Sequence, residues 1–408
     1  MLIAGGHVLD AEGRRFRKLD LRITGGLVAA AREQLEPEPG EVVITAHGLW
    51  LLPGLIDAHV HAIGVEDDLR ALHRQPPYLV AAKSARVLEN MLSRGFTSVR
   101  DAGGADGSLA VAVETGLFSG PRLFPSGRGL ARPGGQGDFR AEGEAELGCP
   151  FCSGARSITR LAAGPAALRA AVLDEIAAGA TQIKVMASGG IASPGGPEAL
   201  QYDAAELRTV VDAAAEAGTY VMAHAYGAAA IRACVEAGIR SIEHGSGLNE
   251  ATAALMAERG TILVPTLVVF DRLAQAGGAL AGIAARIFDE SCASIELARA
   301  AGVAIAHGSD LEGGAHARQS EEFRLKAGVM PLAEVIASAT RIGASLLPAT
   351  PRLGVVDLGA AADLVAFDAN PLHDIEALAS PDRHLKLVVK AGTTVLDRRD
   401  AGKEGREA

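Results

Sequence analysis

Between about residue 50 and residue 345, short apolar runs alternate with alanine-rich segments of helical periodicity. In the alanine-rich segments apolar residues fall at i, i+3, i+4 and i+7, and a glycine ends most of them, which is typical of amphipathic helices. The apolar runs predict eight strands, at residues 51–61, 96–103, 122–127, 182–189, 220–227, 241–246, 261–266 and 303–310. Strands followed by helices pair in parallel, so the pattern predicts an α/β protein and favours a closed (β/α)8 TIM barrel over an open sheet.

Three regions depart from this alternation. Residues 127–163 form a long irregular insertion after the third predicted strand, over the face where barrels keep their sites. The two ends of the chain contain short alternating strands with Gly and Asp turns. We predict that residues 1–50 and 352–408 together form one small β-sandwich domain, beside a barrel that spans residues 51–351.

The charge balance narrows the range of partners. The 408 residues carry a net charge of −10 and show no basic stripe, so we expect neither nucleic acid nor a membrane as a partner. No apolar run approaches the ~20 residues of a membrane span, and the first residues lack the regions of a signal peptide. The lone pair of Cys149 and Cys152 is a weak metal or redox signal, since a second pair is missing. We therefore expect a cytoplasmic protein.

Two histidines stand one residue apart in the stretch DAHVH, at the end of the first predicted barrel strand. Because side chains alternate along a strand, His59 and His61 share one face with Asp57 and point into the barrel. A single buried histidine is usually a core residue, but two unpaired imidazoles on one inward face are costly to bury. This pair alone leaves the core and the metal-ligand interpretations open.

Three later strands also end in a residue that can bind metal. His224, His244 and Asp310 each follow an apolar stretch and lie at its last positions. Packing does not explain why four strands deliver imidazoles and a carboxylate to one rim, whereas zinc and similar divalent metals bind these groups. The set predicts a metal site.

Lys184 lies within the apolar strand QIKVMASGG. Burying an ammonium group is expensive, so a lysine there needs a lowered pKa or a changed charge. A neutral lysine reacts with carbon dioxide to give a carbamate, whose two oxygens can bridge two cations. Alternatively, Lys184 stands at the strand edge and extends its ammonium group into solvent. The spacing alone leaves both interpretations open.

Taken in order, the stretches PGLIDAHVH, IKVMASGG, VMAHAYG, SIEHG and GSD resemble the amidohydrolase superfamily. Within it they resemble the two-zinc branch of prolidase-like and Xaa-Arg/Lys dipeptidases and ochratoxin-type amidases. The resemblance covers nearly the whole chain. It implies a (β/α)8 barrel with two divalent metal ions, commonly zinc, and hydrolysis of an amide bond in a small-molecule substrate, a dipeptide or an N-acyl amino acid. Relatives often assemble, so a homo-oligomer is an open expectation.

The resemblance also implies a role for each matching position. The first metal would be held by His59, His61 and Asp310, the second by His224 and His244, and both would be bridged by carboxylated Lys184. Asp310 would also take the proton of the attacking water, as the catalytic base.

Substrate contacts are implied at two further positions. Tyr226 matches a tyrosine that contacts the C-terminal carboxylate of the substrate, and Gln136 stands where relatives tend to carry histidine. Glutamine keeps hydrogen bonding but cannot be cationic, which puts the dipeptide specificity of relatives in doubt. Arg132 and Arg140 in the same insertion could supply the missing cation.

Two other functions fit the pattern less well. A one-metal deaminase or imidazolone-type cyclic-amide hydrolase generally lacks the lysine and carries a glutamate base near the third histidine, which HAYGA does not offer. A metal-free binding barrel would have lost ligands, whereas every expected position is filled.

We expect His307 and His316 at most to support the ligands, and Arg100 and Asp101 to form hydrogen bonds at the barrel rim.

Overall fold

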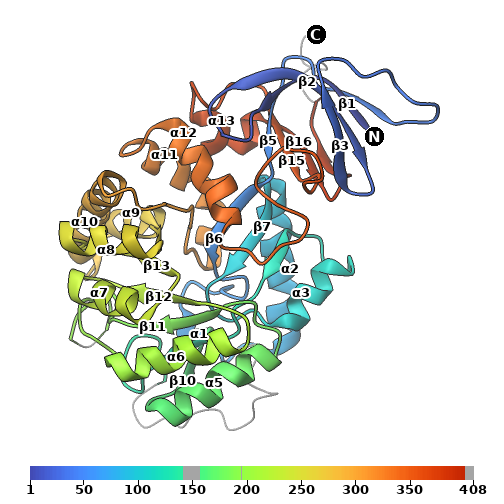
Figure 1. The fold of residues 1–408 in the computed structure, drawn as a ribbon. Coiled ribbons are helices and arrows are strands. Elements are labelled where there is room, and N and C mark those ends of the chain that lie inside the picture. The colour runs from blue at the N-terminus through green and yellow to red at the C-terminus, as the bar shows by residue number, and fades with distance from the viewer. Residues whose placement is uncertain (141–156, 194, 400–408) are drawn as a thin grey trace.

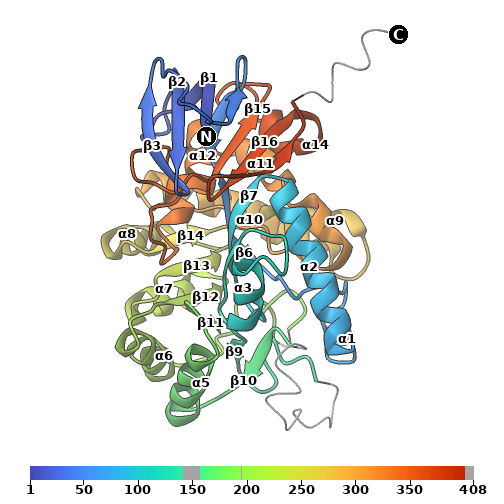
Figure 2. The same cartoon turned by 90° about the vertical axis from the view of Figure 1, so that its right-hand side faces the viewer.

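The computed structural model describes residues 1–140, 157–193 and 195–399. In this part of the chain the strands fall into three sheets, of eight, six and three strands. The eight-stranded sheet lies at one end of the molecule, and the parallel strands with their helices form the rest (Figures 1 and 2). No described helix has the length and apolar character needed to cross a membrane. Cys149 and Cys152 lie outside the described residues.

Both ends of the chain build the eight-stranded sheet. Its strands are β1 (Leu2–Leu9), β2 (Phe16–Thr24), β3 (Leu27–Arg32), β4 (Val43–Thr45), β5 (Trp50–Pro53), β15 (Leu364–Phe367), β16 (Leu385–Lys390) and β17 (Thr393–Asp397). The antiparallel pair β5 and β15 joins the N-terminal strands to the C-terminal ones. A separate sheet from both termini is therefore confirmed. Its strands form one hydrogen-bonded sheet around a core of their own, so the division into two sandwich layers and the domain limits stay predictions.

The remaining strands are parallel. The three-stranded sheet contains β6 (Leu55–Val60), β7 (Phe96–Asp101) and β8 (Arg122–Phe124). The six-stranded sheet contains β9 (Gly129–Ala131), β10 (Thr159–Leu161), β11 (Ile183–Met186), β12 (Val221–Ala225), β13 (Ser241–His244) and β14 (Ile262–Val264). Every residue of β6, β7, β11, β12 and β13 is buried, as expected for parallel strands that are covered on both faces.

Backbone hydrogen bonds connect these sheets at their edges. The predicted eighth strand, residues 303–310, forms a single parallel bridge, between Ile305 and Leu263 of β14. On its other side, the Ala58 N–H of β6 donates to the His307 carbonyl over 2.8 Å. At the opposite edge, residues 125–128 lead directly from β8 to β9. The sheets are thus consistent with a TIM barrel.

Two sequence predictions need correction. The strand predicted at 51–61 is two strands, β5 in the eight-stranded sheet and β6 in the parallel one, separated by Gly54. A Cβ atom at Gly54 would overlap the Thr97 side chain, so only glycine fits where the chain passes between the sheets. The insertion at 127–163 is not irregular throughout, because it carries β9 and β10, which pair in parallel and extend the six-stranded sheet.

Helices cover the outer side of the parallel strands, as Figure 2 shows for α5, α6 and α7. The helices are α1 (Leu69–Leu72), α2 (Pro77–Ser93), α3 (Gly107–Glu114), α5 (Pro165–Ala177), α6 (Ala204–Glu216), α7 (Ala228–Ala237), α8 (Glu250–Arg259), α9 (Leu267–Ala276), α10 (Ala281–Ala300), α11 (Glu321–Ala327), α12 (Leu332–Ala337), α13 (Glu376–Ala379) and α14 (Pro381–His384), with a 3-10 helix at Gly313–Arg318 and a π-helix at Ser338–Ile342. Helix α6 shows how the sequence sets the start and the buried face of such a helix. Asp203 and Glu206 form a capping box at its start, and Leu207, Val210 and Ala214 make up the buried face.

Asp363 holds the eight-stranded sheet against the parallel strands. Its two carboxylate oxygens accept hydrogen bonds from Arg122, the first residue of β8, both over 3.1 Å, and one of them also accepts from the Ala391 N–H over 2.7 Å. The carboxylate is almost fully buried, while Arg122 is partly exposed.

We expect Asp363→Ala to lower the apparent free energy of unfolding by roughly 2–4 kcal/mol, because it leaves a half-buried guanidinium and a backbone N–H without their acceptor. Asp357→Ala is the matched control, since it removes an aspartate–arginine pair that is half exposed on both sides, and should cost less than about 1 kcal/mol. Denaturant unfolding of both variants measures the difference. Equal losses would show that Asp363 has no special part in joining the sheets.

Candidate active site

A cavity of about 1140 Å³ opens at the C-terminal ends of the parallel strands. Its lining contains all eight site residues that the sequence predicted: His59, His61, Gln136, Lys184, His224, Tyr226, His244 and Asp310. They come from different strands and loops, so parallel pairing is what brings residues that are far apart in the sequence to one place. The structure thus brings the predicted residues together around one cavity.

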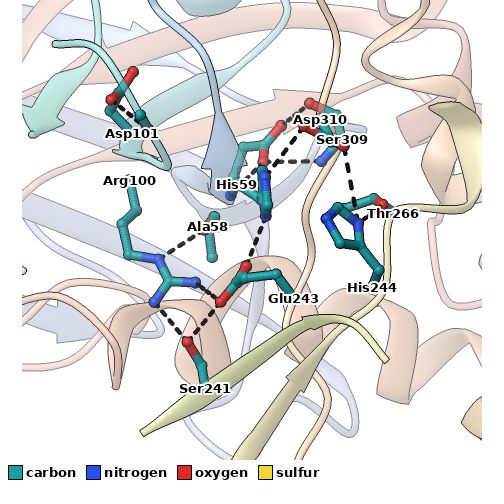
Figure 3. Close-up of polar contacts among 12 residues, drawn as sticks. Ala58, His59, Arg100, Asp101, Ser241, Glu243, His244, Thr266, Ser309 and Asp310 are labelled. Atoms are coloured by element: carbon teal, nitrogen blue, oxygen red, sulfur yellow. Dashed lines mark hydrogen bonds and ion pairs between the residues drawn. The ribbon is translucent and has the colours of Figure 1, made fainter. Parts of the chain in front are cut away.

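His59 and His61 leave β6 on the same side and meet Asp310. The Nε2 atoms of both imidazoles lie close to Asp310 Oδ1, at 3.2 Å for His59 and 3.1 Å for His61. Among the described residues, these three offer ligand atoms within 4.8 Å of one another, as a metal ion requires. Figure 3 shows His59 beside Asp310.

His224 is the penultimate residue of β12, and His244 is the last residue of β13. Their rings lie 4.6 Å apart between centroids, and His244 lies 5.2 Å from the ring of His59. The two strands pair in parallel next to β11, which carries Lys184. The four imidazoles therefore form one cluster along neighbouring strands.

Each of these imidazoles has one ring nitrogen held by a fixed partner. His59 Nδ1 bonds to Glu243 (2.7 Å), His61 Nδ1 to the Gly103 carbonyl (3.0 Å), His224 Nε2 to the Gly189 carbonyl (2.8 Å) and His244 Nδ1 to Thr266 Oγ1 (2.8 Å). A partner on one nitrogen fixes the orientation of the ring and leaves the other nitrogen for a metal. This donor set fits divalent metal ions.

The protonation of the cluster also suits metal binding at two of its members. Burial lowers the pKa of His224 to about 3, with a further contribution from the Lys184 charge, and burial with the His224 charge lowers the pKa of His244 well below its usual value. Both are neutral at pH 7, which is the ligating form. At His61 burial acts in the same direction, but the Asp310 carboxylate outweighs it and raises the pKa to about 9. A metal at His61 would have to displace that proton.

Two of the residues adopt a backbone conformation that L residues rarely occupy. His244 has φ 66° and Asp310 has φ 53°. Such left-handed positions cost of order 1–3 kcal/mol and cluster at functional sites. The Asp310 N–H donates to the His59 carbonyl over 2.9 Å, which holds the turn that directs the carboxylate to the two imidazoles.

Lys184 is fully enclosed on β11, with an exposed fraction of 1%. The alternative in which its ammonium extends into solvent is therefore wrong. It forms no hydrogen bond or ion pair with the described residues. Burial lowers its pKa to about 8, although the carboxylates of Glu243 and Asp310 oppose that shift. A neutral amine, the form that reacts with carbon dioxide, is thus within reach near neutral pH.

A buried ion pair between Glu243 and Arg100 holds the ring of His59. Glu243 of β13 accepts from His59 Nδ1 and from Arg100 Nη2 at 2.9 Å, and both charged side chains are 0% exposed (Figure 3). The Arg100 charge and the His59 hydrogen bond outweigh burial and lower the pKa of Glu243 to about 2. Sequence analysis missed Glu243, although a lone carboxylate in the apolar stretch SIEHG was a usable signal.

The prediction that Arg100 and Asp101 lie at the rim is wrong for Arg100. Its guanidinium lies inside the strands and donates to Ala58 O, Ser241 Oγ and Glu243. Asp101 accepts from three backbone N–H groups of the loops after β6 and β7, those of Ala62, Gly103 and Ala105. It therefore holds the loop whose Gly103 carbonyl fixes His61.

Three other sequence candidates lie outside the ligand cluster. Asp57 shares the strand with His59, but its carboxylate accepts from Ser309 and Gln319 and positions the backbone before Asp310. His307 packs between Phe96 and Phe323 in the core. His316 bonds to the Gly64 carbonyl over 3.0 Å and so holds the loop after β6.

The candidate substrate contacts differ in how firmly they are held. Tyr226 stacks on His244 at 5.2 Å between ring centroids, and burial raises the pKa of its hydroxyl well above the usual value, so the hydroxyl is a donor. Gln136 accepts from Ser193 Oγ over 2.6 Å at the cavity wall. Arg132 is bound to Glu206 and does not line the cavity, whereas Arg140 lines it in a two-point contact with Asp138.

A sequence model of the amidohydrolase family matches residues 50–395. The chain belongs to the amidohydrolase family. The ochratoxinase of Aspergillus niger is 33% identical over 403 residues, 93% of this chain and 83% of that protein. A prolidase complexed with N-methylphosphonate-L-proline is 44% identical, with a TM-score of 0.93 over 97% of this chain and 99% of that one. A Xaa-Pro dipeptidase with bound methionine is 29% identical, with a TM-score of 0.86 over 97% and 99%.

These similarities confirm two of the sequence predictions. The resemblance to the amidohydrolase superfamily and its prolidase and ochratoxinase relatives is correct, and so is the prediction of a metal-dependent hydrolase of amide bonds. The His59, His61 and Asp310 group gives this family assignment a possible metal site in the structure.

We expect Glu243→Gln to weaken metal binding by about 10–100-fold, because an amide holds His59 Nδ1 less firmly and leaves Arg100 without its counter-charge. Chelator competition followed by metal analysis measures the affinity. Glu175→Gln is the matched control, as a buried carboxylate that pairs with Arg128 and Arg160 outside the cavity. If Glu243→Gln folds and binds metal as tightly as the control, Glu243 does not support the site.

Proposed function

We propose that this enzyme hydrolyses the amide bond of dipeptides or N-acyl amino acids with two zinc ions bound in the cavity. The carrying observation is the convergence of four oriented imidazoles, Asp310 and the enclosed Lys184 on one cavity. The relatives that share the whole fold include a prolidase, a Xaa-Pro dipeptidase and an ochratoxinase. We also propose that the parallel strands close into a (β/α)8 barrel.

The ligands would divide between the two ions according to the strands that carry them. His59, His61 and Asp310 would hold one ion, His224 and His244 the other, and a carbamate on Lys184 would bridge them. The contacts of both imidazoles with Asp310 Oδ1 support the first group, and the ring contact of 4.6 Å supports the second. Lys184 lies on the strand next to β12, without a competing ion pair in the described structure.

The metals, when bound, would supply an activated water and polarise the substrate carbonyl. Asp310 would act as the general base. Its contacts with His59 and the hydrogen bond from His61 hold the pKa of Asp310 well below the usual value despite burial, so it is ionised and able to accept a proton. It would then return the proton to the leaving amine. Tyr226, protonated and stacked on His244, is placed to donate a hydrogen bond to the substrate.

Asp310→Asn should retain the fold and lower kcat/KM by at least ~10²-fold, because asparagine tolerates the left-handed backbone but cannot take a proton. Release of amino acids from a library of dipeptides and N-acyl amino acids, with and without a chelator, measures activity. The wild-type enzyme should lose activity on chelation and regain it with zinc and bicarbonate. A variant that keeps more than about a tenth of wild-type kcat/KM would exclude Asp310 as the base.

Carboxylation of Lys184 can be tested without turnover. Protein loaded with zinc in ¹³C-labelled bicarbonate should show one carbamate carbon signal by NMR, and Lys184→Gln should lack it. Lys326→Gln is a matched control, because Lys326 is also a fully buried lysine with a pKa lowered to about 8, but it donates to Ala306 O and Ser338 Oγ away from the cavity. A signal that persists in Lys184→Gln would place the carbamate elsewhere.

A further inference from the structure

The cavity holds several cations, but most are already committed or exposed. Arg140 is held by Asp138 through two hydrogen bonds, of 2.9 Å and 2.7 Å. Arg70 is exposed at the rim, and Lys184 lies at the base among the candidate metal ligands. Gln136, which the sequence places where relatives tend to carry histidine, brings no charge. A substrate that carries a carboxylate therefore needs another partner.

Arg272 differs from these residues. It lies on α9 and lines the cavity, and its side chain is 23% exposed. Its Nε–H is buried and has no hydrogen-bond partner among the described residues. The carboxylate oxygen Glu312 Oε1 lies 3.7 Å from Nη2, which is an ion pair but too long for a hydrogen bond. An unpartnered buried N–H of a charged group is costly, so its retention at a cavity wall points to a ligand.

The packing of α9 places Arg272 on the wall of the same cavity as the candidate metal ligands. Phe270, two residues earlier, contacts the rings of His244 and Tyr226, with centroids 5.9 Å and 6.1 Å away. These contacts join the start of α9 to the wall that carries His244. Val269, Phe270 and Leu273 add apolar surface to the cavity around the guanidinium.

We propose that Arg272 is the residue that binds a carboxylate of the substrate. The guanidinium fork offers two parallel N–H groups to a carboxylate, and the low exposure of the site strengthens such a charge-assisted bond. This inference rests on the proposed function, because it assigns the substrate end of the same cavity. The carboxylate can be the terminal one of the released amino acid or that of an acidic side chain.

The experiment compares wild type, Arg272→Met, Arg272→Lys and Arg259→Met on matched N-acyl substrates. Arg259 is an exposed arginine on α8 and serves as the control. The terminal carboxylate is tested with N-acetyl-leucine against N-acetyl-leucinamide, and the side-chain carboxylate with N-acetyl-glutamate against N-acetyl-glutamine. Release of acetate is measured for all four, so that KM and kcat are obtained separately.

We expect Arg272→Met to lower kcat/KM by about 10–100-fold for substrates with the recognised carboxylate, chiefly through KM, and to leave the matched amide within about threefold. The kcat/KM of Arg272→Lys should lie between the values of wild type and Arg272→Met, since lysine keeps the charge but lacks the two parallel N–H groups of the guanidinium. A loss for both N-acetyl-leucine and N-acetyl-glutamate identifies the terminal carboxylate, and a loss for N-acetyl-glutamate alone identifies the side chain.

Two results would overturn the inference. One is an Arg272→Met enzyme that treats all four substrates as wild type does, and the other is an equal loss on all four, including N-acetyl-leucinamide, which has no carboxylate. Neither would affect the proposed function, which fails only if the wild-type enzyme releases acetate or amino acids from no amide substrate. Calorimetric binding of leucine and leucinamide to zinc-loaded protein gives the same comparison without turnover.

Discussion

The ion pair between Arg100 and Glu243 is the interaction on which the rest of the site depends. It lies among the parallel strands, where the desolvation of two charges is expensive unless the remaining hydrogen-bonding groups are satisfied. Here they are satisfied: Arg100 also donates to the Ala58 carbonyl, and Glu243 also accepts from Ser241 and His59. One pair thus connects β6, β7 and β13, and its free carboxylate oxygen orients the first histidine of the cluster.

The other candidate ligands are also held by hydrogen bonds. Each imidazole is held by a carbonyl, a hydroxyl or a carboxylate on its inner nitrogen, and none of these holding groups is itself a predicted ligand. The strands set the spacing between the imidazoles, and the turns at the strand ends direct the side chains into the cavity. Asp310 and His244 both leave their strands with positive φ, so local strain is concentrated where side chains must turn into the cavity. Packing of the surrounding strands must offset this cost.

Sequence patterns located the residues that line the cavity but not the groups that hold them in place. The alternation rule placed His59 and His61 on one side correctly, since both imidazoles contact Asp310, although the pairing of β6 with β7 shifts register between Asp57 and Val60. The same rule grouped Asp57 with them, yet its carboxylate turns to Ser309, since a side chain's partner depends on tertiary neighbours. Glu243 was overlooked because it precedes a more conspicuous histidine, and its partner Arg100 lies 143 residues away.

Sequence patterns also failed to predict some of the strand boundaries. The apolar run from Leu51 to Ile56 does not reveal that Gly54 separates two sheets, because the reason is close contact with Thr97. Strands β9 and β10 contain three residues each, too short for a periodic pattern to be recognised. The eighth strand was foreseen from its composition, but in the structure it makes only one regular bridge.

The charge of Lys184 links the buried ion pair to the proposed metal chemistry. Arg100 and Glu243 neutralise each other, so the cavity base is left with the Asp310 carboxylate, the Lys184 ammonium and the protonated His61 as its principal charges. Two divalent cations beside an ammonium would repel it, and at low exposure that repulsion is weakly screened. Conversion to a carbamate changes the same side chain from a cation into an anionic ligand. Burial thus favours the neutral amine that reacts with carbon dioxide, and in the proposed site the two cations would compensate the negative charge of the carbamate.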